Sequence, residues 1–354
     1  MAKELLILTL HFTEGGAERV LSELINEWVE MGWKITIVET APEMYSNSYR
    51  VSEDIDYLKF KRQKSGPLNS AKVIHFVIKA MKAHPNATVL AFTKSTMYPL
   101  AVASFFTKNR IVVSERNDPY SSPQKRSRRF LRDLLFKRAD ACIFQTADAM
   151  AYFPQVVREK GTVIPNPINR ELPLPYTGER LKRIVSVCRL DVQKNVPMAI
   201  KAFKRFSSDI PGYTFYIYGR GKLEDELKKL IKEEGLQDKV VLAGFSDNVY
   251  QEMNQCAMFV LSSNFEGISN SMLEALALGI PSVVTDCPIG GARMVIENGV
   301  NGLLVPVGDV DAMYKSMKYL AENEKEAKII SENAAKVRDL FPVEVIAKKW
   351  ADLL

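Results

Sequence analysis

Short apolar runs alternate with amphipathic segments along the whole chain. In the first half, β-branched and apolar runs predict buried strands at residues 4–10, 34–39, 88–92, 110–114 and 141–145. The second half repeats the pattern, with runs at residues 183–189, 214–218, 239–242, 258–261 and 282–285. The segments between these runs have helical periodicity. This alternation is typical of α/β proteins, in which helices cover both faces of a parallel sheet.

A proline-rich segment interrupts the alternation near the middle of the chain. Residues 164–169 read Ile-Pro-Asn-Pro-Ile-Asn, and Pro173 and Pro175 continue the break. A length of 354 residues also suits two domains better than one core. We expect two Rossmann-like, doubly wound domains, at residues 1–170 and 171–342. Because ligands in such sheets lie beyond the carboxyl ends of the strands, we expect a deep cleft between the domains to hold the ligand.

Composition excludes several classes of protein. Hydrophobic residues make up 47% of the chain and charged residues 25%, as in ordinary globular proteins. No apolar run approaches the ~20 residues that span a bilayer, and the first run is too short for a signal-peptide core. The four cysteines and three histidines show no metal-ligand spacing. We therefore expect a cytoplasmic protein with reduced thiols, no protein-held metal and no cofactor.

Positive charge is concentrated in the first half, where residues 1–170 hold 25 Lys and Arg against 17 Asp and Glu. Much of the excess lies in residues 116–138, whose second part predicts an amphipathic helix. We expect its inward side chains to be Phe130, Leu131, Leu134 and Leu135, and its outward ones Lys125, Arg126, Arg128, Arg129 and Arg132. The basic side is either a solvated face or a surface for anionic lipid head groups or a pyrophosphate-linked acceptor. No nucleic-acid motif is present, so we expect no nucleic-acid partner.

Residues 264–286 carry the strongest chemical signal. Glu266 lies in a loop, and Glu274 follows eight positions later in an apolar helix. Carboxylates accept hydrogen bonds from hydroxyls, and a helix N-terminus attracts phosphate, so a nucleotide-sugar would suit the site. The alternative for Glu274 is a capping box with Ser271. The residues between the two carboxylates that we expect to bind the ligand are Gly267, Ile268, Ser269 and Asn270.

Three further segments contribute glycines or cations. Thr13-Glu14-Gly15-Gly16 opens a helix after the first predicted strand, where backbone can approach a phosphate. Arg189 and Lys194 follow the first strand of the second half, and Gly244 and Phe245 follow a later one. Taken separately, a tight turn or an ordinary surface cation would also explain each of them.

Together these segments resemble the retaining glycosyltransferases of family 4 (GT4), which have the GT-B fold. The resemblance covers the E-x7-E string, the G-R-L-x-x-x-K-N string with Cys188 in place of Gly, and the Gly-Gly loop. It implies a metal-independent hexosyltransferase that uses a nucleotide-sugar, most simply a UDP-linked hexose or N-acetylhexosamine. It places Arg189, Lys194, Gly15 and Gly16 at the donor diphosphate, Glu266 at the sugar hydroxyls, Glu274 at the ribose, and Gly244 and Phe245 at the nucleobase.

The acceptor side matches the family less well. Many relatives carry a His where this chain has Glu115, Arg116 and Asn117, so these three residues are acceptor-side candidates whose alternative is a structural role at a strand end. The resemblance implies a saccharide acceptor on polyprenyl diphosphate, used in bacterial polysaccharide or glycan assembly. It also implies that the helix at residues 343–354 packs on the N-terminal domain. With the basic helix, this predicts a peripheral protein at the anionic inner face of the cell membrane.

Three other functions fit the sequence less well. A non-hydrolysing UDP-sugar epimerase shares the GT-B architecture but needs acids and bases at the sugar, and histidines here are few. A dinucleotide-dependent oxidoreductase needs G-x-G-x-x-G, and the third glycine is missing after Gly15 and Gly16. An inactive nucleotide-sugar-binding scaffold would not need the complete set of phosphate and carboxylate positions. The sequence therefore favours the transferase.

Overall fold

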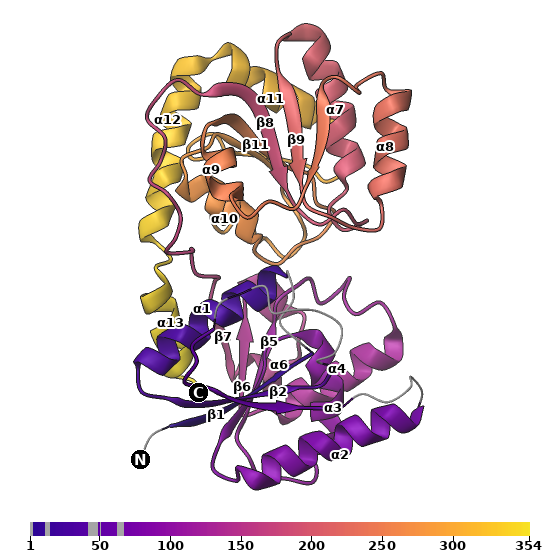
Figure 1. Ribbon diagram of the computed structural model, residues 1–354, viewed down its shortest axis with the longest axis vertical. Coiled ribbons are helices and arrows are strands. Elements are labelled where there is room, and N and C mark those ends of the chain that lie inside the picture. Colours follow the sequence, from indigo (N-terminus) through magenta and orange to yellow (C-terminus); the bar gives the residue numbers. More distant parts are fainter. Residues whose placement is uncertain (1–2, 11–14, 42–48, 50, 62–66) are drawn as a thin grey trace. The chain divides into compact units, whose positions relative to one another are not determined.

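The protein folds into two compact units, seen here in a computed structural model (Figure 1). The structure describes residues 3–10, 15–41, 49, 51–61 and 67–354, so Thr13 and Glu14 of the Gly-Gly loop lie outside the described residues. The first unit runs to Pro167 and includes Val343–Leu354, and the second is Ile168–Pro342. The expected domain boundary after residue 170 lies three residues beyond Pro167.

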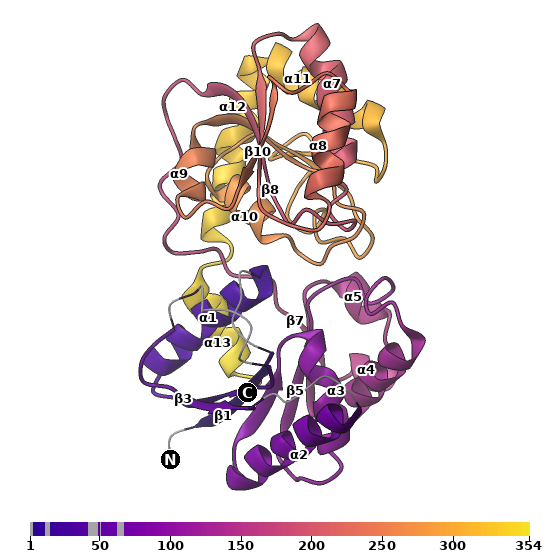
Figure 2. The same ribbon diagram turned by 45° about the vertical axis from the view of Figure 1, so that its right-hand side comes forward.

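The first unit is built on a seven-stranded parallel sheet with the order β3-β2-β1-β4-β5-β6-β7. Helices α2, α3 and α4 bury one face of this sheet, and α1 and α13 cover the other (Figure 2). The strands are β1 Glu4–Thr9, β2 Lys34–Glu39, β3 Asp56–Lys59, β4 Thr88–Ala91, β5 Ile111–Glu115, β6 Ala141–Phe144 and β7 Gly161–Val163. The helices are α1 Gly16–Glu30, α2 Pro67–Ala83, α3 Lys94–Ala103, α4 Arg126–Arg138, α5 Ala147–Ala151, α6 Gln155–Arg158 and α13 Val343–Ala351.

The C-terminal helix α13 is part of the first unit, where it lies beside α1. The ring centroids of Trp350 and Trp28 are 6.2 Å apart, and both side chains are fully buried. Trp28 Nε1 donates to Ala347 O at 3.1 Å, and Thr88 Oγ1 donates to Leu354 O at 2.8 Å. Because aromatic side chains bury large apolar areas, this contact holds the end of the chain firmly on the first sheet.

The second unit contains a six-stranded parallel sheet with the order β10-β9-β8-β11-β12-β13. Helices α7, α8 and α11 bury one face, and α9 and α10 bury the other. The strands are β8 Leu181–Val187, β9 Thr214–Tyr218, β10 Val240–Gly244, β11 Cys256–Leu261, β12 Ser282–Thr285 and β13 Leu303–Val305. The helices are α7 Val196–Asp209, α8 Glu224–Glu233, α9 Val249–Asn254, α10 Asn270–Ala277, α11 Val310–Glu322 and α12 Glu324–Ala335, followed by a 3₁₀ helix at Lys336–Asp339.

Both sheets reverse their strand order beside their first strand. In the first unit β1 lies between β2 and β4, and in the second β8 lies between β9 and β11. Because the strands are parallel, the loops that follow them all leave from the carboxyl end of each sheet. Ligands of doubly wound sheets bind at this end, at the point where the strand order reverses. The candidate residues of each unit lie at the carboxyl end of their own sheet.

The ten predicted strands are confirmed to within two residues at each end, but three strands were missed. These are β3, β7 and β13, and all three lie at the edge of a sheet. An edge strand has a neighbour on one side only, and each of these is short and partly exposed. β3 and β7 contain charged, polar or glycine residues, and β13 is an apolar run of only three residues. None of them therefore has the longer apolar run by which a buried parallel strand is recognised.

The prediction for the basic helix α4 was wrong at two positions. Phe130, expected inside, is 67% exposed, and Arg132, expected outside, is fully buried. Arg132 Nη1 lies 3.3 Å from Glu115 Oε2 and donates to Ser122 O at 2.8 Å, and its guanidinium lies 4.9 Å from the Tyr152 ring. A hydropathy pattern assigns any arginine to solvent, because the carboxylate that makes burial possible comes from a different element. The rest of the basic set is exposed at Lys125, Arg126 and Arg128 and half-buried at Arg129.

Arg132→Ala should lower the free energy of unfolding of the first unit by about 3–5 kcal/mol, because it leaves the Glu115 carboxyl buried without its cation. Arg128→Ala removes an exposed arginine of the same helix and should change stability by less than about 0.5 kcal/mol. Urea unfolding followed by tryptophan fluorescence measures both. Equal free energies of unfolding for the two variants would show that the buried Arg132–Glu115 pair does not contribute to stability.

Candidate functional site

Four loops of the second unit meet at the carboxyl end of its sheet, and they form two pairs whose members approach so closely that only glycine fits at the contact. They follow β8, β9, β11 and β12. Gly219, after β9, has φ +130°, and a Cβ there would overlap Cys188 O in the loop after β8. A Cβ on Gly291, after β12, would overlap Gly267 O in the loop after β11. These close approaches fix the backbone that carries the candidate side chains.

Glu266 is the centre of the contacts among these loops. Its Oε1 forms an ion pair with Lys194 Nζ and accepts a hydrogen bond from Ser263 Oγ at 2.8 Å. Its Oε2 accepts from Gln193 Nε2 at 3.2 Å. The loop after β8 and the loop after β11 are therefore joined through one carboxylate, and charge-assisted hydrogen bonds of this kind are the strong ones.

Lys194 and Arg189 differ in their surroundings, although both follow β8. Burial alone would lower the pKa of Lys194, but the Glu266 carboxylate more than offsets it and the pKa is raised, so the side chain is an ammonium. The Arg189 side chain is 62% exposed, with Nη2 lying 3.3 Å from Asp191 Oδ2 and 3.4 Å from Gln193 Oε1. Gln193 thus connects the exposed cation to Glu266.

Glu274 does not form the capping box that was considered for it. Helix α10 begins at Asn270 and its N-cap is Ser269, so Ser271 lies inside the helix. A capping box pairs the N-cap residue with the third helical residue, and Glu274 is the fifth. The Glu274 side chain is buried, and its Oε1 accepts from Tyr250 Oη at 3.4 Å.

The remaining donor-side candidates are at the same carboxyl end of the second sheet. Gly267, Ile268 and Ser269 are buried in the turn that enters α10, and Asn270 begins the helix. Gly244 has φ +70° at the end of β10, and the Phe245 ring that follows is 45% exposed. The Arg220 guanidinium lies 5.9 Å from this ring. An exposed ring beside a cation offers a surface on which a planar base can stack.

In the first unit, Gly15 is the N-cap of α1 and Gly16 its first residue. The Glu18 carboxylate folds back over Gly15, where a Cβ would overlap Glu18 Oε2. Glu18 is the third residue of the helix, the position from which a carboxylate reaches back to the N-cap. The glycine therefore has a structural use in this turn, alongside its predicted role at a phosphate.

The acceptor-side candidates lie at the end of β5, with Glu115 as its last residue and Arg116 and Asn117 directly after it. Burial raises the pKa of Glu115 to about 7, although the Arg132 guanidinium and the Asn117 amide both lower it. The Arg116 guanidinium lies over the rings of Phe92 and Trp350, at 4.9 and 5.6 Å, and burial lowers its pKa to about 9. Its Nη2 donates to Asn166 Oδ1, and Asn117 lies half-buried beside it. Glu115 and Arg116 are thus held mainly by groups of their own unit.

Sequence reasoning missed three residues that organise the site. Gln193 and Ser263 hold Glu266, and Tyr250 holds Glu274. Gln193 directly precedes Lys194 in the string that resembles the family, so that string could have identified it. Tyr250 lies on α9, outside every string that resembles the family. Among the described residues, no group of three or more His, Cys, Asp or Glu side chains is placed to hold a metal ion. Within the same ranges, no helix is both long enough and apolar enough to cross a bilayer.

Comparison with known proteins identifies the family. The family model for group 1 glycosyl transferases matches residues 177–337, and that for glycosyltransferase family 4 matches residues 14–172. The chain is 31% identical over 342 residues to the N-acetylgalactosamine-N,N'-diacetylbacillosaminyl-diphospho-undecaprenol 4-alpha-N-acetylgalactosaminyltransferase of Campylobacter jejuni, covering 92% of this chain and 91% of that enzyme. The protein is a family 4 glycosyltransferase.

Further relatives of this glycosyltransferase span its whole length. A second C. jejuni enzyme, GalNAc-alpha-(1->4)-GalNAc-alpha-(1->3)-diNAcBac-PP-undecaprenol alpha-1,4-N-acetyl-D-galactosaminyltransferase, is 26% identical over 99% of this chain and 97% of its own. Anabaena HepE, solved with UDP and glucose, is 21% identical with a TM-score of 0.84, covering 99% of this chain and 98% of its own. Staphylococcus aureus TarM, solved with UDP, is 12% identical with a TM-score of 0.81, covering 99% of both chains. The two structures show that the glycosyltransferase has the GT-B fold.

The pKa of Glu115 predicts that stability falls as pH rises. A carboxyl with a pKa near 4.5 when unfolded and about 7 when folded binds its proton more tightly in the folded state. Its stabilising contribution is therefore complete below pH 4.5 and is lost as the pH rises to about 7, by up to about 1.4 kcal/mol per pH unit. Glu115→Gln keeps the hydrogen-bonding shape without titrating. Urea unfolding of both proteins between pH 4.5 and 7.5 measures the difference, and parallel curves would contradict it.

Proposed function

We propose that this glycosyltransferase transfers a hexose or N-acetylhexosamine, with retention, from a UDP-sugar to a saccharide carried on polyprenyl diphosphate. The observation that carries the donor half is the cluster of Arg189, Lys194 and Glu266 at the switch point of the second sheet. It offers cations for a diphosphate directly beside a carboxylate for sugar hydroxyls. The acceptor half is supported by the two C. jejuni relatives, whose names specify undecaprenol-linked saccharides.

The contacts of Glu266 suggest how the donor is received. Lys194 shares its charge with this carboxylate, and Arg189 reaches it through Gln193. A diphosphate that attracts Lys194 weakens the ion pair and leaves Glu266 Oε1 able to accept from a sugar hydroxyl. From the family resemblance we assign Glu274 to the ribose, Gly244 and Phe245 to the uracil, and Gly15 and Gly16 to the diphosphate.

The proposed chemistry needs no metal ion. The acceptor hydroxyl attacks on the face from which UDP departs, and a donor phosphate oxygen takes its proton. Negative charge grows on the diphosphate as the bond between its oxygen and the anomeric carbon of the donor sugar breaks. Arg189 and Lys194 stabilise that charge, which in many enzymes is the largest single contribution to the rate.

The exposed side of α4 supports a membrane-bound acceptor. Phe130 and Tyr120 are more than half exposed, and the exposed basic residues Lys125, Arg126 and Arg128 lie next to them in the chain. Aromatic and cationic side chains together are typical of surfaces that rest on anionic lipid head groups. We therefore place the protein at the inner face of a bacterial cell membrane, as a peripheral protein.

The function is tested by supplying a panel of UDP- and GDP-sugars with a synthetic polyprenyl-diphosphate saccharide, in the presence of EDTA. We expect mass spectrometry to detect transfer of one sugar, and NMR to show that the anomeric configuration of the donor is kept. Transfer with inversion, or activity that disappears in EDTA and returns with Mn²⁺, would contradict the mechanism. Failure with every saccharide acceptor, despite donor hydrolysis, would contradict the acceptor class.

The donor roles predict different effects for two variants. Glu274→Ala should weaken UDP binding, because a charge-assisted hydrogen bond contributes about 1.5–3 kcal/mol. Lys194→Ala should lower turnover by about 10²–10³-fold and affect binding of free uridine far less, since it acts on charge that develops in the reaction. Calorimetry measures the first effect and initial rates at saturating donor the second. Equal losses of uridine affinity and turnover in Lys194→Ala would argue against its assigned role.

The membrane surface predicts binding that depends on the exposed side of α4. The wild type should float with anionic vesicles at low salt and be released at high salt. Arg126→Ser with Arg128→Ser should weaken binding by about 1 kcal/mol for each charge. The matched control, Lys229→Ser with Lys232→Ser, removes two exposed charges from α8 of the second unit and should float like the wild type. Equal flotation of both double variants would contradict a specific role for α4 and indicate only non-specific attraction between the basic protein and anionic vesicles.

A further inference from the structure

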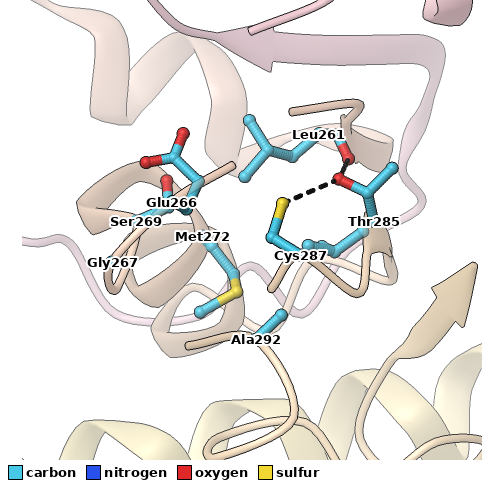
Figure 3. Close-up of a pocket in the computed structure, with 9 residues that line it drawn as sticks. Leu261, Glu266, Gly267, Ser269, Met272, Thr285, Cys287 and Ala292 are labelled. Carbon is cyan, nitrogen blue, oxygen red and sulfur yellow. Dashed lines mark hydrogen bonds between the residues drawn. The ribbon is translucent and has the colours of Figure 1, made fainter. Parts of the chain in front are cut away.

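A small pocket lies directly beside Glu266, beneath the loop that follows β11 (Figure 3). It has room for about one group the size of a water molecule or a methyl. Of its lining residues, all within the described part of the chain, Glu266 is the most exposed and so marks the mouth. The lining residues are Leu261, Glu266, Gly267, Ser269, Met272, Val284, Thr285, Cys287 and Ala292.

The interior of the pocket is apolar. Leu261, Met272, Val284 and Ala292 contribute only carbon and thioether surface, and all four are buried. Apart from Glu266, the polar lining side chains already have partners. Thr285 Oγ1 donates to Ser263 O at 2.8 Å, and Cys287 Sγ donates to the same oxygen at 3.1 Å. Ser269 Oγ lies within hydrogen-bond distance of Ser271 Oγ, at 3.2 Å. A buried water needs two to four polar partners, and a hydroxyl placed here would lose its hydrogen bonds to water. A methyl group forms no hydrogen bonds with water, so none is lost when it enters the pocket.

The mouth of the pocket is polar and has capacity for one more donor. An ionised carboxylate has about four acceptor positions, and Glu266 uses three of them for Lys194, Ser263 and Gln193. A group that presents an N–H to Glu266 and a methyl to the apolar interior would satisfy both parts. The acetamido group of an N-acetylated sugar has this combination, and a plain hexose hydroxyl does not.

We propose that this pocket receives the methyl of an N-acetyl group, so that the sugar transferred is an N-acetylhexosamine. The proposal rests on the proposed function, because that function assigns the donor sugar to Glu266. Filling or leaving empty one methyl-sized apolar site changes specificity by about 10–200-fold. The wild type should therefore favour UDP-GlcNAc or UDP-GalNAc over UDP-Glc and UDP-Gal by a ratio in this range.

Ala292 offers a direct test, because its methyl group lines the pocket and takes no part in the ionic contacts of Glu266. Ala292→Val and Ala292→Leu should reduce the preference for N-acetylhexosamine donors by at least tenfold, while affinity for UDP alone stays within twofold. Ala292→Gly enlarges the site and should bind an N-propanoyl UDP-sugar better than the wild type does. Thermal unfolding shows whether each variant folds. If Ala292→Leu does not fold, Ala292→Gly still tests the pocket.

Competition calorimetry with UDP, the four UDP-sugars and the N-propanoyl analogue separates the outcomes. An N-acetyl preference that the leucine variant removes supports the pocket assignment. Equal binding of hexose and N-acetylhexosamine donors by the wild type, or a preference unchanged in all three Ala292 variants, overturns it and leaves UDP-sugar transfer standing. Absence of binding by UDP and by every UDP-sugar overturns the proposed donor class and the pocket assignment together.

Discussion

The donor-side loops depend on the ion pair between Lys194 and Glu266. The two residues lie 72 positions apart in the chain, and the pair joins the loop after β8 to the loop after β11. Backbone bonds strengthen the same junction, since Asn264 N donates to Gln193 O at 2.7 Å. A partly buried ion pair is more favourable when further donors bind its carboxylate, and Ser263 and Gln193 supply two such donors to Glu266. The charges are therefore oriented before any ligand arrives.

The central strands of both sheets could be predicted from the sequence because they are buried on both faces. Runs such as residues 35–38 are continuously apolar or β-branched, and a parallel sheet is the usual place for them. The edge strands β3 and β7 have no such run, and the apolar run of β13 is only three residues long. Helix α4 shows a second limit, since Arg132 is held by a carboxylate on β5 that helical periodicity cannot locate.

Much of the candidate site could be located from motif strings, but its internal contacts could not. The strings place Arg189, Lys194 and Glu266 in loops that follow strands, and Glu274 in a helix after one of those loops. The parallel sheet brings these loops together. They do not say that Lys194 and Glu266 pair with each other, or that Tyr250 holds Glu274. Such partners depend on side-chain direction across separate elements, which spacing along the chain does not encode. The capping-box alternative failed for a local reason, because α10 begins two residues earlier than that alternative required.

The loop after β12 forms one wall of the proposed pocket, and its backbone is held in place at several points. Ile289 has φ +67°, a conformation rare for a β-branched residue, and such strain costs on the order of 1–3 kcal/mol. The strain persists because the surroundings fix the loop. Arg293 forms an ion pair with Asp286 at 3.4 Å, and Cys287 Sγ donates a hydrogen bond to Ser263 O. Gly291 meanwhile lies against Gly267. A pocket wall held at so many points cannot readily move to admit a different group, so the discrimination proposed for this pocket would follow from its fixed volume and polarity.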